Sequence, residues 1–137
     1  MARHFENALA VAEFLEAHPL ASNVTHPGLP SSRFRPLVER YLPGGAGAVF
    51  SFDCEGGREA GQDFIRGVTL WSHLANVGDS KSLIIHPAST THRQLSDEEL
   101  QAAGVGPGTI RLSVGTESID DLIWDLGQGF ARVAASA

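Results

Sequence analysis

The sequence has a single cysteine, Cys54, among its 137 residues. One cysteine cannot form an intramolecular disulfide, and the spaced cysteine sets of structural zinc sites are missing. A chain of this length buries about two-thirds of the surface that its unfolded form exposes, so it does not need such cross-links. The sequence therefore predicts one globular domain without disulfides, in keeping with an intracellular protein.

Positive charge is also scarce. Lysine and arginine number 10 against 16 aspartates and glutamates, so the formal net charge is −6. This balance argues against a nucleic-acid surface, which needs clustered positive charge. No apolar run approaches the ~20 residues that span a bilayer, and the first residues lack the apolar core of a signal peptide. We therefore expect a soluble, cytoplasmic protein that binds neither nucleic acid nor membranes.

Lysine is the rarest cationic residue. Lys81 is the only one in the chain, and the other nine cationic side chains are arginines. Any chemistry that needs a lysine must therefore use Lys81 or a lysine outside this chain.

Helical and strand patterns alternate from end to end. The spacing of apolar residues predicts helices over residues 5–16, 32–41, 58–67, 96–103 and 117–133. It predicts strands over residues 22–26, 46–54, 70–74, 83–86 and 110–114. Short strands with several helices favour an α+β domain, in which helices cover one mainly antiparallel sheet of about four to five strands.

The most informative single residue is Arg111, between Ile110 and Leu112 in a predicted strand. Alternation places its side chain on the face opposite to those two. An arginine cannot lose its proton, so it must reach water or pair with an anion. Two interpretations stay open: a solvated arginine or one ion-paired with Glu117, and a guanidinium that binds a substrate carboxylate through two parallel hydrogen bonds.

The segment 86–92 (HPASTTH) concentrates hydroxyls and two imidazoles after a predicted strand, where functional groups often lie. His86 and His92 are six residues apart without a suitably spaced carboxylate, so they do not predict a metal site. Ser82 and Ser89 lack the Gly-x-Ser-x-Gly motif of a hydrolase nucleophile. Side chains that stabilise an irregular loop explain this composition equally well.

Several segments together resemble one enzyme family. They are residues 78–92 (GDSKSLIIHPASTTH), the glycine run 104–108 with residues 110–115 (IRLSVG), and residues 117–122 (ESIDDL). Their order and spacing are similar to those in the C-terminal part of the pyridoxal-phosphate-dependent enzymes of cysteine and methionine metabolism. Residues 45–49, 56–58 and Phe64 match as well, so the resemblance covers nearly the whole chain.

The resemblance implies a fold and an activity. The fold is the small C-terminal domain of a fold-type I pyridoxal-phosphate enzyme. Residues 76–83 (NVGDSKSL) look most like the O-acetylhomoserine sulfhydrylases, whereas cystathionine synthases and lyases usually have Ser-Leu-Gly at positions 76–78. The implied reaction replaces the acetate of O-acetylhomoserine by sulfide or methanethiol and gives homocysteine or methionine, with pyridoxal phosphate as the electron sink.

The resemblance also implies roles for particular residues. Arg111 matches the family arginine that binds the substrate α-carboxylate. Asn76 stands where relatives have a serine that helps to bind the same carboxylate, and its amide can donate in a similar way. The loop that faces the active site in relatives corresponds here to Ser89, Thr90, Thr91 and His92.

The lysine that holds the cofactor in relatives lies in a larger preceding domain, in a Ser-x-Thr-Lys-type segment that this sequence does not contain. Lys81 belongs to a different motif. We therefore expect residues 1–137 to form the substrate carboxylate-binding domain alone, without a catalytic residue and inactive by itself. The parent enzyme is expected to be a homo-oligomer, and the isolated domain to self-associate through exposed apolar surface.

Two alternatives stay open. The chain could be a stand-alone α+β module that binds a ligand or a protein without catalysis, in which case its surface should be polar all round. It could also be the corresponding part of a cystathionine synthase or lyase, which only the variant at residues 76–83 disfavours.

Overall fold

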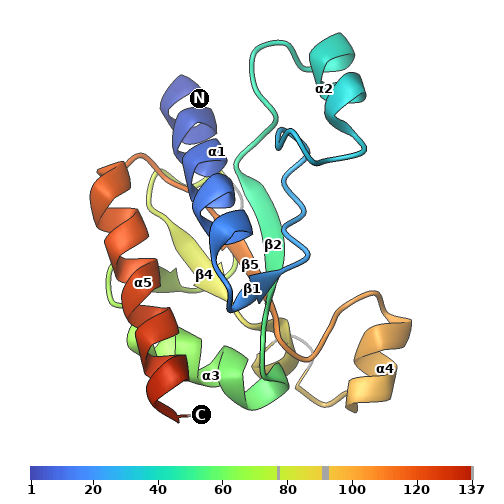
Figure 1. The fold of residues 1–137 in the computed structure, drawn as a ribbon, viewed down its shortest axis with the longest axis vertical. Helices are drawn as coiled ribbons and strands as arrows, with labels where there is room; N and C mark the ends of the chain where they lie inside the picture. The colour runs from blue at the N-terminus through green and yellow to red at the C-terminus, as the bar shows by residue number, and fades with distance from the viewer. Residues whose placement is uncertain (77, 91–92, 137) are drawn as a thin grey trace.

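The computed structural model describes residues 1–76, 78–90 and 93–136. Within these ranges a five-stranded sheet carries helices on one face (Figure 1). The strands are β1 (Ala21–Ser22), β2 (Val49–Cys54), β3 (Ser72–His73), β4 (Leu83–Ile85) and β5 (Thr109–Ser113). The helices are α1 (Ala2–Ala17), α2 (Arg35–Tyr41), α3 (Gly57–Gly67), α4 (Asp97–Ala102) and α5 (Ile119–Ser136), with a short 3₁₀ helix η1 (Pro87–Ser89) after β4.

The strand order in the sheet is β1-β2-β5-β4-β3. Strand β5 lies in the centre and runs antiparallel to both of its neighbours, β2 and β4. At one edge β1 is antiparallel to β2, whereas at the other edge β3 is parallel to β4. The predicted α+β class and the mainly antiparallel sheet are confirmed, and the parallel pair at the edge makes the sheet mixed.

The strand predicted over residues 22–26 is wrong beyond Ser22. Asn23 adopts a positive φ of 49°, in the left-handed region that ends a strand, and its side-chain amide donates to the Asp53 carboxylate at 2.8 Å. Asparagine is one of the few residues that accept this backbone conformation at low cost. The regular pairing of β1 with β2 therefore ends at Ser22, although the Thr25 backbone N–H still donates to the Ser51 carbonyl at 2.9 Å.

The strand predicted over residues 70–74 is also shorter, because a buried carboxylate binds its first residues. Asp125 of α5 is almost fully buried and accepts the backbone N–H groups of Thr69, Leu70 and Trp71 at 2.8–3.2 Å. These amides point toward α5 instead of toward a neighbouring strand. Only Ser72–His73 then pairs with β4.

The core lies between the sheet and helices α1, α3 and α5. One face of the sheet contributes buried side chains from β2, β4 and β5, namely Phe50, Phe52, Ile84, Ile110 and Leu112. The rings of Phe64 on α3 and Phe130 on α5 have centroids 4.7 Å apart, and Phe52 contacts both. Gly129 permits this approach of the two helices, because a Cβ atom there would lie 2.9 Å from the Phe64 ring.

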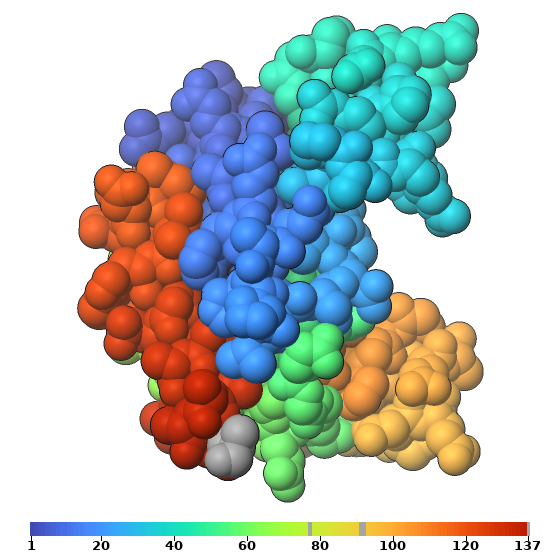
Figure 2. All heavy atoms as spheres, viewed as in Figure 1, coloured from blue at the N-terminus to red at the C-terminus, as the bar shows by residue number. Residues whose placement is uncertain are grey.

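Helix α2 stands apart from this core. None of its residues is buried, and large apolar side chains on it and beside it are exposed: Phe34, Leu37, Tyr41 and Leu42. Figure 2 shows the segment projecting from the body of the molecule, with the α4 region projecting below it and an indentation between the two. This surface is not polar all round, and self-association through it stays a prediction.

No helix in the described ranges is long and apolar enough to cross a membrane.

We expect Phe130→Ala to lower the free energy of unfolding by about 3–5 kcal/mol, because it empties the centre of the aromatic cluster. Trp124→Ala is the matched control on the same helix, since that ring is 63% exposed. Its effect should stay within about 0.5 kcal/mol. Urea unfolding of both variants measures the difference, and equal losses would contradict the packing described above.

Candidate functional site

Arg111 lies at the middle of β5, with Ser51 of β2 and Ile85 of β4 as its register partners. Its side chain is on the face of the sheet opposite to Ile110 and Leu112, as the alternation predicts, and it is half-buried. The guanidinium Nη2 donates to the backbone carbonyl of Asn76 at 3.3 Å. The structure thus brings together Arg111 and Asn76, which lie 35 positions apart in the sequence.

Arg111 does not form the ion pair with Glu117 that the sequence left open. Both carboxylate oxygens of Glu117 accept from Ser82 instead, one from the backbone N–H and one from the hydroxyl, each at 2.7 Å. Over residues 1–76, 78–90 and 93–136, the arginines in ion pairs are Arg35, Arg58 and Arg66. A guanidinium has five N–H donors, so Arg111 keeps donors available for an anion.

The polar groups nearest to Arg111 on this face bind one another. The Thr25 hydroxyl donates to the Ser51 carbonyl at 3.1 Å and accepts from the Ser51 backbone N–H at 2.9 Å. The Asp53 carboxylate accepts from the Thr109 hydroxyl at 2.5 Å and from Asn23. These contacts bond Asp53, the acidic residue on the same face of β2, to Asn23 and to Thr109, which lies two residues before Arg111 in β5.

Ser89 and Thr90 form hydrogen bonds with His86, whereas Arg111 donates to Asn76. The Ser89 hydroxyl lies 2.8 Å from His86 Nδ1, and the Thr90 hydroxyl donates to the His86 carbonyl at 2.8 Å. Both side chains therefore stabilise the turn that contains η1. Thr91 and His92, the other two residues predicted for this loop, lie outside the described residues.

His86 is fully buried, and protein groups use both of its ring nitrogens. Nε2 lies 2.6 Å from the Pro107 carbonyl, so it carries the proton, and Nδ1 accepts from Ser89. Burial lowers the pKa of His86, the Pro107 carbonyl opposes this shift, and the positive charge of Arg58 adds to it. Gly61 leaves room for the ring, because a Cβ atom there would lie 2.5 Å from Nε2.

Arg58 at the start of α3 is a structural residue that the motif analysis gave no role. Its guanidinium donates to the Ala88 carbonyl and to the Leu95 carbonyl at 3.1 Å, and it forms an ion pair with Asp97 at 3.0 Å. One side chain thus binds both ends of the segment that follows β4. Arg58 was part of the family match at residues 56–58, which gave it no particular role.

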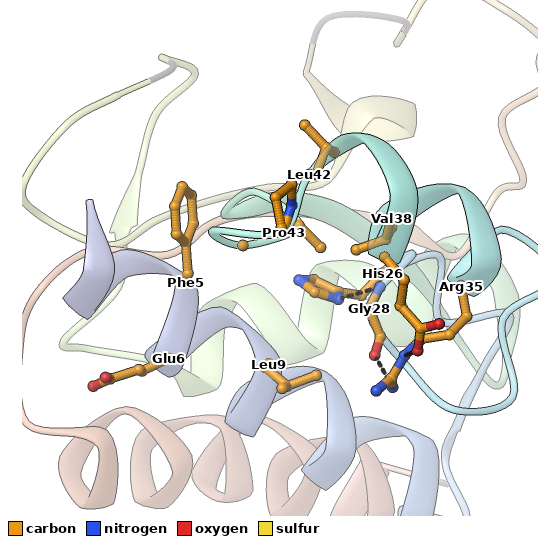
Figure 3. A pocket seen from close by; sticks show the side chains of 12 residues that line it. Phe5, Glu6, Leu9, His26, Gly28, Arg35, Val38, Leu42 and Pro43 are labelled. Atoms are coloured by element: carbon orange, nitrogen blue, oxygen red, sulfur yellow. Dashed lines mark hydrogen bonds and ion pairs between the residues drawn. The ribbon is translucent and has the colours of Figure 1, made fainter.

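A second candidate site is an apolar groove of about 340 Å³ between α1 and α2 (Figure 3). Phe5 and Leu9 of α1 face Val38 and Leu42 across it. Several polar groups inside it bond to one another: His26 Nδ1 accepts from the Gly28 N–H at 3.1 Å, and Arg35 donates to the Gly28 carbonyl at 2.7 Å and to Glu39 at 3.2 Å. The groove shares no lining residue with the Arg111 face.

Cys54, the single thiol, is buried at the end of β2. Burial raises the pKa of this thiol to about 12, with a smaller contribution from the charge of Glu55. The thiolate is the reactive form of cysteine, so Cys54 cannot serve as a nucleophile near neutral pH.

Comparison with known proteins identifies the family. Residues 1–131 match the model of the family described as "Cys/Met metabolism PLP-dependent enzyme", where PLP is pyridoxal phosphate. The chain belongs to this family of pyridoxal-phosphate-dependent enzymes. The implied fold and cofactor dependence of the family are thereby confirmed.

Within this family, the chain is similar to enzymes named as O-acetylhomoserine sulfhydrylases or (thiol)-lyases. The chain is 48% identical over 134 residues to the O-acetyl-L-homoserine sulfhydrylase of Leptospira meyeri, an alignment that covers 97% of this chain and 30% of the relative. A solved structure of the O-acetylhomoserine (thiol)-lyase of Campylobacter jejuni is 46% identical, with a TM-score of 0.84, over 94% of this chain and 31% of that one. It contains an N'-pyridoxyl-lysine-5'-monophosphate.

The chain is also similar to an enzyme with a different name, a cystathionine gamma synthase. The cystathionine gamma synthase of Xanthomonas oryzae pv. oryzae, solved with aminoacrylate and cysteine, is 40% identical with a TM-score of 0.87. The match covers 98% of this chain and 35% of that protein. The chain therefore spans about a third of the length of the relatives that it matches.

The residues of this chain do not form a site that could hold pyridoxal phosphate through a lysine and a phosphate-binding group. Lys81, the only lysine, is exposed, and its backbone N–H donates to the Asp79 carboxylate at 2.9 Å. An exposed lysine beside an acidic residue offers neither enclosure nor a second cation for a phosphate group.

The free energy of unfolding should fall as the pH is lowered from 7.5 to 5.5. Burial lowers the pKa of His18, His26 and His86 in the folded state, so below about pH 6.5 the unfolded chain binds protons that the folded chain excludes. A buried histidine such as His86 contributes at most about 1.4 kcal/mol per pH unit, and His18, which is only partly buried, contributes less because water screens its charge. Urea unfolding of His86→Gln should show lower stability at pH 7.5 but a shallower decline, and an unchanged slope would contradict this account.

Proposed function

We propose that residues 1–137 form the C-terminal, substrate carboxylate-binding domain of a pyridoxal-phosphate-dependent O-acetylhomoserine sulfhydrylase. The single observation that carries this proposal is the pairing of Arg111 with Asn76 on the open face of the central strand. The family resemblance implied that Arg111 and Asn76, which lie far apart in the sequence, bind the same carboxylate. The identity of 48% to a sulfhydrylase supports the choice of activity.

Arg111 is suited to hold a carboxylate. Its strand has neighbours on both sides, so the backbone that carries it is fixed, and no carboxylate of the described residues neutralises it. A guanidinium binds a carboxylate through two parallel hydrogen bonds, which fix direction as well as position. In the complete enzyme this contact would fix the position and the orientation of the substrate at its α-carbon.

The proposed reaction replaces the acetate of O-acetylhomoserine by sulfide or methanethiol. Pyridoxal phosphate supplies the electron sink when bound, and the proposal assigns its lysine and the proton transfers to parts of the enzyme outside this chain. Ser89, Thr90, Thr91 and His92 would border the active site without a catalytic step. We also propose a cytoplasmic homo-oligomer, as expected from the family.

A second candidate is the corresponding domain of a cystathionine synthase or lyase, because a cystathionine gamma synthase is 40% identical. The segment 76–83 favours the sulfhydrylase. Assays of the complete enzyme with O-acetylhomoserine and either sulfide or cysteine separate the two, since a cystathionine synthase would prefer cysteine as the sulfur donor. If the domain were a binding module without catalysis, neither activity would be found.

In the complete enzyme, Arg111→Ala should weaken substrate binding by about 2–5 kcal/mol, or roughly 30-fold to several thousandfold, because it removes a charge-assisted pair from a shielded site. The content of pyridoxal phosphate should not change. Arg132→Ala, on the exposed side of α5, is the control for loss of one arginine. Steady-state kinetics with O-acetylhomoserine measure the effect, and wild-type kinetics in Arg111→Ala would remove the assignment.

The isolated chain should form no stoichiometric, site-specific adduct with pyridoxal phosphate, because Lys81 is exposed and nothing near it holds a phosphate. An absorbance spectrum of the mixture, followed by borohydride reduction and peptide mapping, tests this. The expected result is substoichiometric labelling of the two primary amines, Lys81 and the N-terminus. Stoichiometric labelling of Lys81 would show that the cofactor is bound by this domain after all.

A further inference from the structure

Glu117 closes a compact hydrogen-bonded cluster around Ser82. Its Oε1 accepts the Ser82 backbone N–H and its Oε2 accepts the Ser82 hydroxyl, both at 2.7 Å. The same hydroxyl accepts from the Gly115 backbone N–H at 2.8 Å. Ser82 is fully buried, so these bonds are shielded from water and costly to leave unmade.

The turn 115–117 is itself fixed from two sides. The side-chain amide of Asn7 on α1 donates to the Gly115 carbonyl at 3.1 Å and to the Glu117 carbonyl at 2.9 Å. Thr116 donates twice to the Ser80 carbonyl, from its backbone N–H at 2.9 Å and from its hydroxyl at 3.2 Å. A Cβ atom at Gly115 would lie 2.3 Å from the Ser80 carbonyl oxygen, so the two segments are in direct contact.

This cluster joins the two parts of the Arg111 site. The turn 115–117 follows directly from β5, the strand that carries Arg111. The segment that it holds, Ser80 to Ser82, is the continuation of the segment that begins at Asn76, whose carbonyl accepts from Arg111. The same strand is therefore bonded to this segment at two places, at Arg111 and at the 115–117 turn.

We propose that Glu117 is a positioning residue for the carboxylate site: by holding Ser82 it keeps Asn76 in register with the Arg111 guanidinium. The proposal rests on the proposed function for the identity of the carboxylate. The Glu117 carboxylate is bonded to Ser82 rather than to Arg111, so its proposed effect on the carboxylate is indirect. An ionised carboxylate suits this role because it accepts both Ser82 donors at once.

Glu117→Gln keeps the shape of the side chain but has only one oxygen acceptor, so one of the two bonds to Ser82 is lost. Glu117→Ala removes both. Asp121→Asn is the matched control, since it neutralises an exposed carboxylate in the first turn of α5, close to Glu117 in sequence. Thermal unfolding of each variant of the 137-residue chain shows whether it folds.

The first measurement is amide hydrogen exchange in the 137-residue chain, which needs no substrate. The Ser82 amide and the neighbouring segment should exchange about tenfold faster or more in Glu117→Ala, which removes the acceptor of the Ser82 N–H, than in wild type, while the amides of β2 and β5 keep their protection. Asp121→Asn should exchange as wild type does. Unchanged protection of Ser82 in Glu117→Ala would overturn the proposal.

The second measurement is a double-mutant cycle in the complete enzyme. Glu117→Gln should raise KM for O-acetylhomoserine about tenfold, in the same direction as Arg111→Ala, and should add no further increase in the Arg111→Ala background. Increases in KM that multiply would show that Glu117 acts independently of Arg111 and would overturn its positioning role.

The two measurements separate the proposals. If Arg111→Ala has wild-type kinetics, the proposed function fails, while the exchange data still decide whether Glu117 holds Ser82. If Ser82 loses protection in Glu117→Ala but KM changes in neither Glu117 variant, the hydrogen-bond cluster exists and its role at the carboxylate site is wrong.

Discussion

The register of strand β5 is the constraint on which the rest of the structure depends. Antiparallel pairing on both sides leaves its backbone no freedom, and alternation then sends Ile110 and Leu112 into the core and Arg111 to the opposite face. A slip of one residue would bury the guanidinium among the phenylalanines of the core and expose two large apolar side chains. Burial of the apolar residues therefore also sets the position of the candidate carboxylate-binding group.

Sequence patterns predicted most of the elements, because apolar periodicity reports directly on which side chains are buried. The face of Arg111 and the capping box at Ser96 and Glu99 were both predictable, since each depends on residues adjacent in sequence. The pairing with Asn76 came only from the family resemblance. Periodicity alone carries no information on which loop reaches which strand.

The errors have a common physical origin, namely polar side chains that bind distant backbone groups. Asp125 draws the amides of residues 69–71 away from the sheet, and Asn23 ends β1 early through its bond to Asp53. Glu117 was considered as a partner of Arg111 because the two are close in sequence, yet it binds Ser82. Such contacts depend on how segments far apart in the chain are brought together, and no local sequence pattern predicts them.

The burial of Cys54 has a practical consequence. A thiol with a pKa of about 12 that is closed off from solvent reacts slowly with oxidants and alkylating reagents as long as the fold is intact. Two copies of the chain cannot become cross-linked through it without unfolding first. The single cysteine therefore reports on local unfolding. Its rate of alkylation in the purified protein measures how often the end of β2 opens, and no dye has to be attached.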